Sequence, residues 1–183
     1  MPNIKILLDV DGVLADFVGE ACRHFGMPEI AKNWPSGEYN VAKVLQLPAT
    51  TFWDALGGSF WTNIPKTTEA DEIVKLCGPY DTCLLTSPPL NPYVAAIKIR
   101  WISKMFPQFE RKFLIGPAKE FCAAPNHILI DDNVLNVIEF GKAGGNAILV
   151  PRPWNDSYAL AHGGTVPTIK WHLEYIVNRI ERS

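Results

Sequence analysis

Five short runs of apolar residues recur along the chain and predict the buried strands of one sheet. Each run holds three to five residues, and its apolar positions are continuous rather than alternating with polar ones. Continuous runs are typical of strands that are covered on both faces, as in a parallel sheet. The five predicted strands are Ile4–Leu8, Thr82–Leu85, Phe113–Ile115, Ile128–Ile130 and Ala147–Val150.

Between these runs, and at the end of the chain, apolar residues recur with helical spacing. Tyr93–Met105 and Val134–Lys142 carry such patterns, and Gly144-Gly145 after the second is a helix stop signal. Residues 169–180 have the spacing of an amphipathic terminal helix. Because strands and helices alternate, the predicted class is α/β, with a Rossmann-like parallel sheet and helices on both faces.

The segment from residue 16 to residue 68 breaks this alternation. It separates the first predicted strand from the second by about seventy residues, more than a simple crossover needs, and it is rich in Trp, Phe, Pro and Gly. Prolines at positions 28, 35, 48 and 65 punctuate its turns. We predict a small, mostly helical cap, residues 16–68, inserted after the first strand of a core made of residues 1–15 and 69–183.

The composition fits one compact domain and gives no strongly basic surface. Of 183 residues, 48% are hydrophobic and 20% charged, and the formal net charge is -2. Polymeric nucleic acid is bound largely through neutralisation of its phosphates, so we do not expect it as a partner, whereas a small anion needs only local charge. Asp9 and Asp11 interrupt the N-terminal apolar run, which therefore lacks the length of a signal peptide or membrane span. We expect a cytoplasmic protein with no membrane partner.

Polar side chains follow three of the predicted strands directly. Asp9 and Asp11 follow the first, Thr86-Ser87 the second and Asp131-Asp132 the fourth. Because the carboxyl ends of parallel strands open onto one crevice, these groups should converge. Several carboxylates in one place are unfavourable unless a cation or a shared proton relieves their repulsion. Mg²⁺ suits such a site, because it prefers hard oxygen ligands and is usually held by one or two carboxylates plus a substrate phosphate.

These residues resemble, in chain order, the motifs of haloacid dehalogenase-like (HAD) phosphatases. The string Asp9–Val13 resembles the first motif, and Thr86, Lys119 and Asp131-Asp132 resemble the second, third and fourth. A narrower similarity is to the 5'(3')-deoxyribonucleotidase branch of that superfamily. It is carried by Asp9–Phe17, Leu85–Pro88, the Lys98-x-x-Trp101 pattern, Asp131–Asn133 and Arg152–Asn155.

The resemblance implies a magnesium-dependent phosphomonoesterase that hydrolyses (deoxy)nucleoside monophosphates through an aspartyl-phosphate. Asp9 would be the nucleophile and Asp11 the general acid and base. Mg²⁺ would be bound by Asp9, the backbone carbonyl of Asp11 and Asp131, with Asp132 bonded to its waters. The residues implied to contact the substrate are Thr86, Ser87, Lys98, Lys119 and Phe17.

The predicted cap holds an unusual density of large aromatic residues, and two interpretations of them stay open. A nucleobase can stack on such rings for about 1–3 kcal/mol each, and Phe17, next to the first motif, is the best candidate. Alternatively, the rings form the core of a small insertion. The residues are Phe17, Trp34, Trp53, Phe60 and Trp61.

Simpler interpretations exist for the site residues too. Asp131-Asp132 could cap a helix, Thr86-Ser87 could belong to a turn, and Lys98 and Lys119 could be exposed. Two other functions stay open: a phosphatase for another small metabolite such as a sugar phosphate, and a non-catalytic module that binds a phosphorylated ligand. Retention of Asp9 with the other acidic residues disfavours the second. The oligomeric state is also open, with a homodimer among the alternatives.

Overall fold

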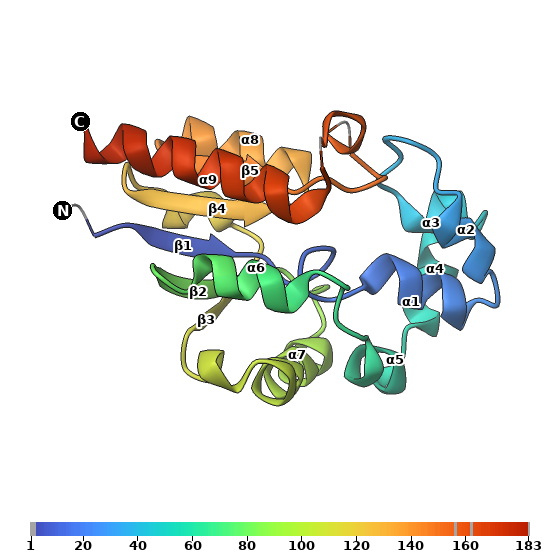
Figure 1. Ribbon diagram of the computed structural model, residues 1–183. Coiled ribbons are helices and arrows are strands. Elements are labelled where there is room, and N and C mark those ends of the chain that lie inside the picture. The colour runs from blue at the N-terminus through green and yellow to red at the C-terminus, as the bar shows by residue number, and fades with distance from the viewer. Residues whose placement is uncertain (1–2, 156, 162, 183) are drawn as a thin grey trace.

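The computed structural model describes residues 3–155, 157–161 and 163–182. Five strands form one parallel sheet in the order β3-β2-β1-β4-β5 (Figure 1). In the register, Leu8 pairs with Leu84 on one side and Ile130 on the other, so three strands end side by side. Each predicted strand is present within one residue at either end. The strands are β1 (Lys5–Leu8), β2 (Asp81–Thr86), β3 (Phe113–Ile115), β4 (His127–Asp131) and β5 (Asn146–Leu149).

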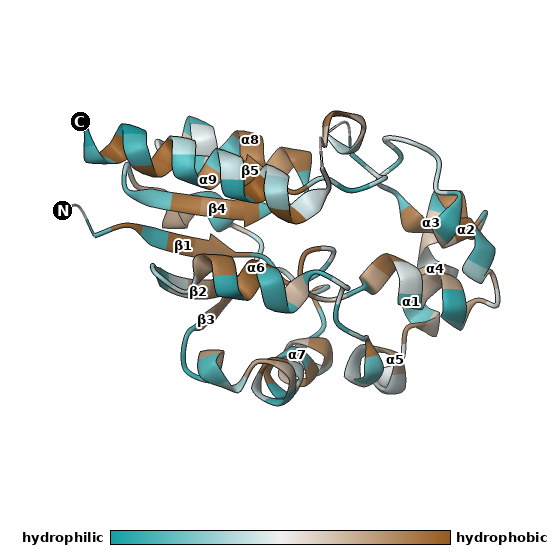
Figure 2. Cartoon of the chain, in the orientation of Figure 1, coloured by the Kyte–Doolittle hydropathy of each residue, from teal (hydrophilic) through white to brown (hydrophobic). Residues whose placement is uncertain are grey.

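Both faces of the sheet are buried, which explains the continuous apolar runs. Side chains alternate between the faces along each strand. Leu7 therefore packs with Phe140 on one face, whereas Ile6 and Leu8 join the larger core on the other face, which includes Leu173. Figure 2 shows hydrophobic colour along most of β1 and β4. The predicted α/β class with a Rossmann-like parallel sheet is confirmed.

Among the described residues of the core, four helices and three short 3₁₀ turns connect or follow the strands. One helix matches its predicted bounds, one begins a residue early at Pro92, and the terminal helix begins four residues before Ile169. The helices are α6 (Ala70–Cys77), α7 (Pro92–Met105), α8 (Val134–Lys142) and α9 (Thr165–Glu181), and the turns are η1 (Pro107–Phe109), η2 (Lys119–Cys122) and η3 (Tyr158–Leu160). None of the helices in the described residues is long and apolar enough to cross a membrane.

The inserted segment folds into five short helices beyond the carboxyl ends of the strands (Figure 1). Where it leaves and rejoins the core, the chain pairs with itself: the Asp16 amide donates to the Pro65 carbonyl at 2.9 Å, and Ala15 pairs with Lys66. A domain division at exactly residues 15/16 and 68/69 stays a prediction. The helices are α1 (Phe17–His24), α2 (Pro28–Lys32), α3 (Val41–Val44), α4 (Ala49–Ala55) and α5 (Gly58–Asn63).

Arg152 ties the loop after β1 to the start of α6. Its Nε donates to the Gly12 carbonyl at 2.6 Å and its Nη1 to Glu69 Oε1 at 2.7 Å. Burial alone would raise the pKa of Glu69. The hydrogen bond from Thr68 and the charge and hydrogen bond of Arg152 outweigh it and lower the pKa to about 2. The ionised form of Glu69 is therefore stabilised in the folded protein.

This linkage predicts a stability loss in acid that depends on Glu69. Because the folded pKa lies below the ordinary value of 4.5, the contribution is present above about pH 4.5 and disappears as the pH falls through about 2. Glu69→Gln should lower the free energy of unfolding by about 1–3 kcal/mol at pH 7, and the difference from wild type should shrink towards pH 2. Urea unfolding across this range measures it. Glu174→Gln, in an exposed pair with Lys170 at 3.8 Å, is the control and should change little.

Candidate active site

The carboxyl ends of β1 and β4 bring three carboxylates together. Asp9 directly follows β1, and its amide donates to the Ile130 carbonyl of β4 at 3.0 Å. One oxygen each of Asp9, Asp131 and Asp132 lies within 4.8 Å of the others, and all three residues are buried. The structure thus places together three of the four acidic residues that were predicted to converge, whereas Asp11 is not part of this group. Their individual roles stay predictions.

Lys119 lies among these carboxylates. It begins the turn η2, its side chain is 2% exposed, and its Nζ lies 2.6 Å from Asp9 Oδ1 and 2.7 Å from Asp131 Oδ2. Burial would lower the pKa of Lys119, but the charges of the two carboxylates raise it above its ordinary value. Lys119 is therefore a cation of the site, and the alternative that it is an exposed lysine is wrong.

One lysine does not offset the three carboxylates. Burial raises the pKa of Asp9 well above its ordinary value, and the charges of Asp131 and Asp132 add to this while Lys119 opposes it. Burial and then the charge of Asp131 raise the pKa of Asp132 to about 7, against a hydrogen bond from Trp154. Crowded buried carboxyls of this kind favour either a proton or a cation. The donor set, all hard carboxylate oxygens, fits Mg²⁺.

Gly12 permits the close approach of the first loop to this cluster. Its φ of +79° lies in the left-handed region, where residues with a Cβ are strained. A Cβ on Gly12 would also lie 2.2 Å from Asp132 Oδ2. A glycine at this position of the first motif is therefore required for two separate structural reasons: the backbone conformation and the space beside Asp132.

Thr86, at the end of β2, has a buried hydroxyl that the protein leaves without a partner. The residue is fully buried, and Oγ1 is the one buried side-chain polar atom without a hydrogen bond within the described residues. Such a hydroxyl costs about 1–3 kcal/mol of stability unless a ligand satisfies it. Thr86 ends β2 rather than lying in a turn, and its predicted contact with substrate stays a prediction.

Thr86→Val tests this directly, because valine has nearly the same shape and no hydroxyl. We expect the free energy of unfolding to stay equal or rise by about 1 kcal/mol, since a buried group without a partner is removed. Catalytic efficiency should fall about 10-fold or more if Oγ1 binds the substrate. Parallel urea unfolding and steady-state kinetics measure both effects. A drop in stability with unchanged kinetics would assign Thr86 a structural role. Thr82→Val, at the other end of β2, should instead cost stability, since Thr82 Oγ1 donates to the Cys77 carbonyl at 2.9 Å.

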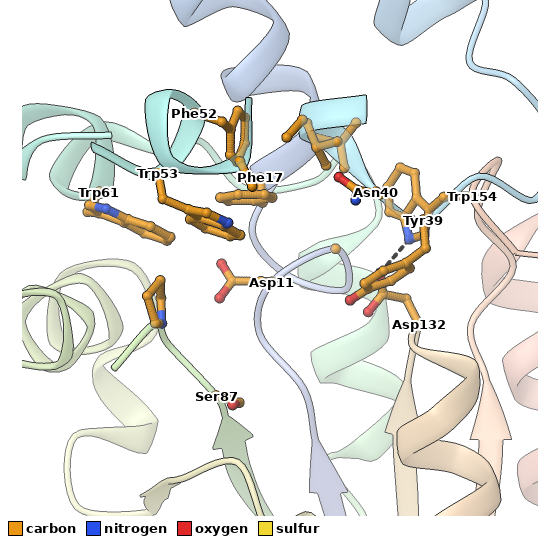
Figure 3. A pocket seen from close by; sticks show the side chains of 16 residues that line it. Asp11, Phe17, Tyr39, Asn40, Phe52, Trp53, Trp61, Ser87, Asp132 and Trp154 are labelled. Carbon is orange, nitrogen blue, oxygen red and sulfur yellow. Dashed lines mark hydrogen bonds between the residues drawn. The ribbon is translucent and has the colours of Figure 1, made fainter. Parts of the chain in front are cut away.

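Asp11 and Asp132 line the same pocket, and Figure 3 shows the Asp11 carboxylate pointing away from that of Asp132. The Nζ of Lys98, on α7, bonds to Asp11 Oδ1, and the Lys98 side chain is 1% exposed. Lys98 Nζ also lies 5.2 Å from the centre of the Trp61 ring. The alternative of an exposed Lys98 is wrong. Its contact with Asp11 places it as the partner of that carboxylate, whereas the predicted contact of Lys98 with substrate stays untested.

The pocket has a volume of about 350 Å³ and lies between the inserted helices and the strand ends. Phe17 lies over Trp53 and Trp61 with ring centres 6.1 and 5.5 Å away and interplanar angles of 21° and 24°. These rings therefore pack on one another, as expected for the core of a small insertion, and they also form a wall of the pocket. Stacking of a nucleobase on them stays a prediction. The lining includes Asp11, Gly12, Phe17, Tyr39, Asn40, Phe52, Trp53, Trp61, Ser87, Asp132 and Trp154.

Tyr39, Asn40 and Trp154 are among the lining residues that were not expected as site residues. Tyr39 and Asn40 lie in an irregular segment before α3, and Trp154 follows β5 in another irregular segment. Burial, followed by the negative charge of Asp132, raises the pKa of the Tyr39 hydroxyl. Trp154 Nε1 donates to Asp132 Oδ2 at 2.5 Å. Neither segment has a hydrophobic period, so the sequence pattern offered no sign that it reaches the site. Trp34, by contrast, packs behind Trp154 and is not among the lining residues.

Comparisons with known proteins agree with this fold. No protein-family model and no curated protein matches the sequence. A HAD family hydrolase from Deinococcus radiodurans with bound phosphate and sodium superposes with a TM-score of 0.61, at 16% identity over 96% of each chain. The fold is that of HAD-family hydrolases. A protein from Clostridium acetobutylicum described as a predicted phosphatase gives 0.58 at 12% identity, covering 94% of this chain and 99% of that one. YfnB from Bacillus subtilis, assigned as a HAD-hydrolase and bound to magnesium, gives 0.54 at 13% identity, covering 82% and 89%.

Proposed function

We propose that this protein is a magnesium-dependent phosphomonoesterase that hydrolyses (deoxy)nucleoside monophosphates through an aspartyl-phosphate on Asp9. The observation that carries the proposal is the set of groups at the strand ends. Asp9 lies beside Lys119, the hydroxyl of Thr86 has no partner within the described residues, and Asp11 lines an adjoining aromatic pocket. A tetrahedral anion would meet a nucleophile, a cation and a hydrogen-bond donor at one place, which is the arrangement that phosphoryl transfer needs.

In the first step a carboxylate oxygen of Asp9 bonds to phosphorus and the bond from phosphorus to the ester oxygen breaks. The departing oxygen takes a proton from Asp11. In the second step Asp11 accepts a proton from water as the water oxygen bonds to the same phosphorus, which releases inorganic phosphate and restores the Asp9 carboxylate. Lys98 Nζ bonds to Asp11 Oδ1. This bond keeps the Asp11 carboxylate on the pocket side, where the leaving group would lie.

The residues that would hold the metal are Asp9 and Asp131, with the backbone carbonyl of Asp11, and with Asp132 bonded through water. When bound there, Mg²⁺ supplies positive charge that stabilises the oxygens of the phosphoryl group during transfer. Lys119 contributes a second positive charge in a site from which water is largely excluded, where such charges act most strongly. The crowding of three buried carboxyls within 4.8 Å supports this part of the proposal.

The pocket supports a leaving group that carries a planar ring. Phe17, Trp53 and Trp61 line the pocket with stacked rings. Trp61 is buried, whereas Trp53 is 47% exposed, so part of the Trp53 ring is free to contact a ligand. The nucleoside that leaves from a nucleotide carries such a ring as its base, with about 1–3 kcal/mol gained for each stacking contact. A sugar phosphate would place its hydroxyl groups against these rings, where the hydroxyl groups would lack hydrogen-bond partners. The pocket therefore favours nucleotides over the alternative of sugar phosphates.

A substrate panel tests the proposal. Phosphate release from 5'- and 3'-nucleoside monophosphates, in ribo and deoxy forms, is compared with release from hexose and pentose phosphates, with Mg²⁺ or with EDTA. We expect that phosphate release from nucleotides requires Mg²⁺. We also expect kcat/KM for nucleotides to be at least about 10-fold above that for any sugar phosphate, because of the stacking energy. Equal rates on both classes would remove the nucleotide claim. Phosphate release that EDTA leaves unchanged would remove the magnesium claim.

A further inference from the structure

Trp154 connects the inserted helices to the acidic cluster. On one side its Nε1 donates to Asp132 Oδ2 at 2.5 Å, the interaction drawn as a dashed line in Figure 3. On the other side its ring meets the ring of Trp34 edge to face, with centres 6.1 Å apart and an interplanar angle of 76°. Trp34 is itself held, because its Nε1 donates to the Glu38 carbonyl at 2.8 Å. One half-buried side chain thus contacts both parts of the molecule.

The segment around Trp154 is anchored independently of the indole. Arg152 Nε donates to the Gly12 carbonyl at 2.6 Å, and Asn155 Nδ2 donates to the backbone carbonyl of Asp132 at 2.8 Å. The Gly37 amide donates to the Pro153 carbonyl at 3.0 Å, which adds a second link to the inserted segment. The backbone positions of both site loops therefore do not depend on the indole N–H.

The direction in which the Asp132 carboxylate points does depend on the indole N–H of Trp154. Within residues 3–155, 157–161 and 163–182, Trp154 Nε1 is the one donor that bonds to this carboxylate. Asp131, by contrast, accepts hydrogen bonds from Lys119, the Asn133 amide and Asn136 Nδ2. Repulsion from the neighbouring carboxylates favours rotation of Asp132 away from the cluster, and the indole N–H opposes that rotation.

We propose that Trp154 is a positioning residue that holds the Asp132 carboxylate in the acidic cluster and thereby sets the affinity of the site for Mg²⁺. This inference rests on the proposed function, which assigns the cluster to the metal. Groups that orient metal-binding side chains typically change metal affinity about 10- to 100-fold when they are removed. Through its contact with Trp34 the same residue also links that affinity to the inserted segment, which carries Tyr39 and Asn40 into the pocket.

The test is the Mg²⁺ affinity of the substrate-free protein, measured by isothermal titration calorimetry at pH 8. Trp154→Phe keeps an aromatic ring against Trp34 and loses the N–H, so we expect Mg²⁺ binding about 10- to 100-fold weaker. Trp154→His should restore most of the affinity, because the five-membered imidazole places Nε2 where the indole has Nε1 and is neutral at this pH. Trp171→Phe, a 63% exposed ring stacked on Tyr175, is the matched control and should bind as wild type does.

Melting temperatures show which variants are folded. A folded Trp154→Phe protein with wild-type Mg²⁺ affinity would overturn the inference, and so would a folded Trp154→His protein that binds as weakly as Trp154→Phe. If Trp154→Phe does not fold, the Trp154→His protein decides: affinity within about threefold of wild type supports the inference, and a 10-fold loss overturns it. The titration contains no substrate, so it measures Mg²⁺ affinity independently of hydrolysis. If wild type hydrolyses no phosphomonoester, the proposed function is overturned, but the comparison of Mg²⁺ affinities is unchanged.

Discussion

Asp9→Asn is expected to abolish phosphate release, with kcat reduced by on the order of 10⁴-fold or more, as for other enzymes that lose their nucleophile. An amide oxygen is a poor nucleophile and cannot form the aspartyl-phosphate. The shape of the side chain is kept, and Lys119 keeps its contact with Asp131 at 2.7 Å. The measurement is phosphate release in Mg²⁺ with the best nucleotide of the panel, extended to long incubation.

Stability separates loss of chemistry from loss of fold in this variant. Burial is the largest cause of the raised pKa of Asp9, so the charged carboxylate is unfavourable in the folded protein without metal. In EDTA, Asp9→Asn should therefore unfold at an equal or higher temperature than wild type. Asp81→Asn is the control, because Asp81 begins β2 at the opposite end of the sheet and pairs with exposed Lys112. Substantial turnover by Asp9→Asn would contradict the role of Asp9 as nucleophile.

The fold could be predicted because burial on both faces of a parallel sheet leaves a direct pattern in the sequence. Each central strand places apolar side chains in both cores, as Leu7 and Leu8 do, so its run is continuous. The convergence of Asp9, Thr86 and Asp131 followed from topology alone, since each comes at the carboxyl end of a predicted strand. For such residues the position along the chain determines the position in space.

The burial of Lys98 and Lys119 could not be predicted from the order of the strands. Lysine is usually exposed, and no periodic pattern marks Lys98 or Lys119 as buried. Lys98 is buried because Asp11 neutralises it and the rings of Trp61 and Trp101 cover its ammonium group. Lys119 is buried between Asp9 and Asp131. Both placements depend on partners far away in the sequence, so tertiary contacts decide them.

The positions of the irregular segments were harder to predict than the burial of the two lysines. Tyr39 and Trp154 reach the pocket from loops that are held by hydrogen bonds between residues far apart in the sequence, such as that from the Gly37 amide to the Pro153 carbonyl. Local sequence does not specify these bonds. The resemblance to deoxyribonucleotidases did include Arg152–Asn155, although it gave Trp154 no role. The pocket wall on this side was therefore found only in the structure.

Lys119→Met is expected to cost about 3–5 kcal/mol of unfolding free energy in EDTA at pH 8, the usual range when one partner of a buried charge network is removed. Methionine fills most of the space but leaves Asp9 and Asp131 without their cation, next to Asp132. The cost should shrink as the pH falls, because burial and mutual repulsion raise the pKa of Asp9 and protonation then relieves the repulsion. Urea unfolding at several pH values measures it.

Mg²⁺ should return part of this stability, because a divalent cation can neutralise the same carboxylates that Lys119 neutralises. We therefore expect a larger gain from Mg²⁺ in Lys119→Met than in wild type, whereas kcat should stay about 10²- to 10³-fold low, since the charge beside the phosphoryl group is missing. Lys112→Met removes an exposed ion pair of 3.1 Å and should change stability by less than about 1 kcal/mol, with or without Mg²⁺. Equal gains from Mg²⁺ in both lysine variants would show that the metal does not bind at the acidic cluster.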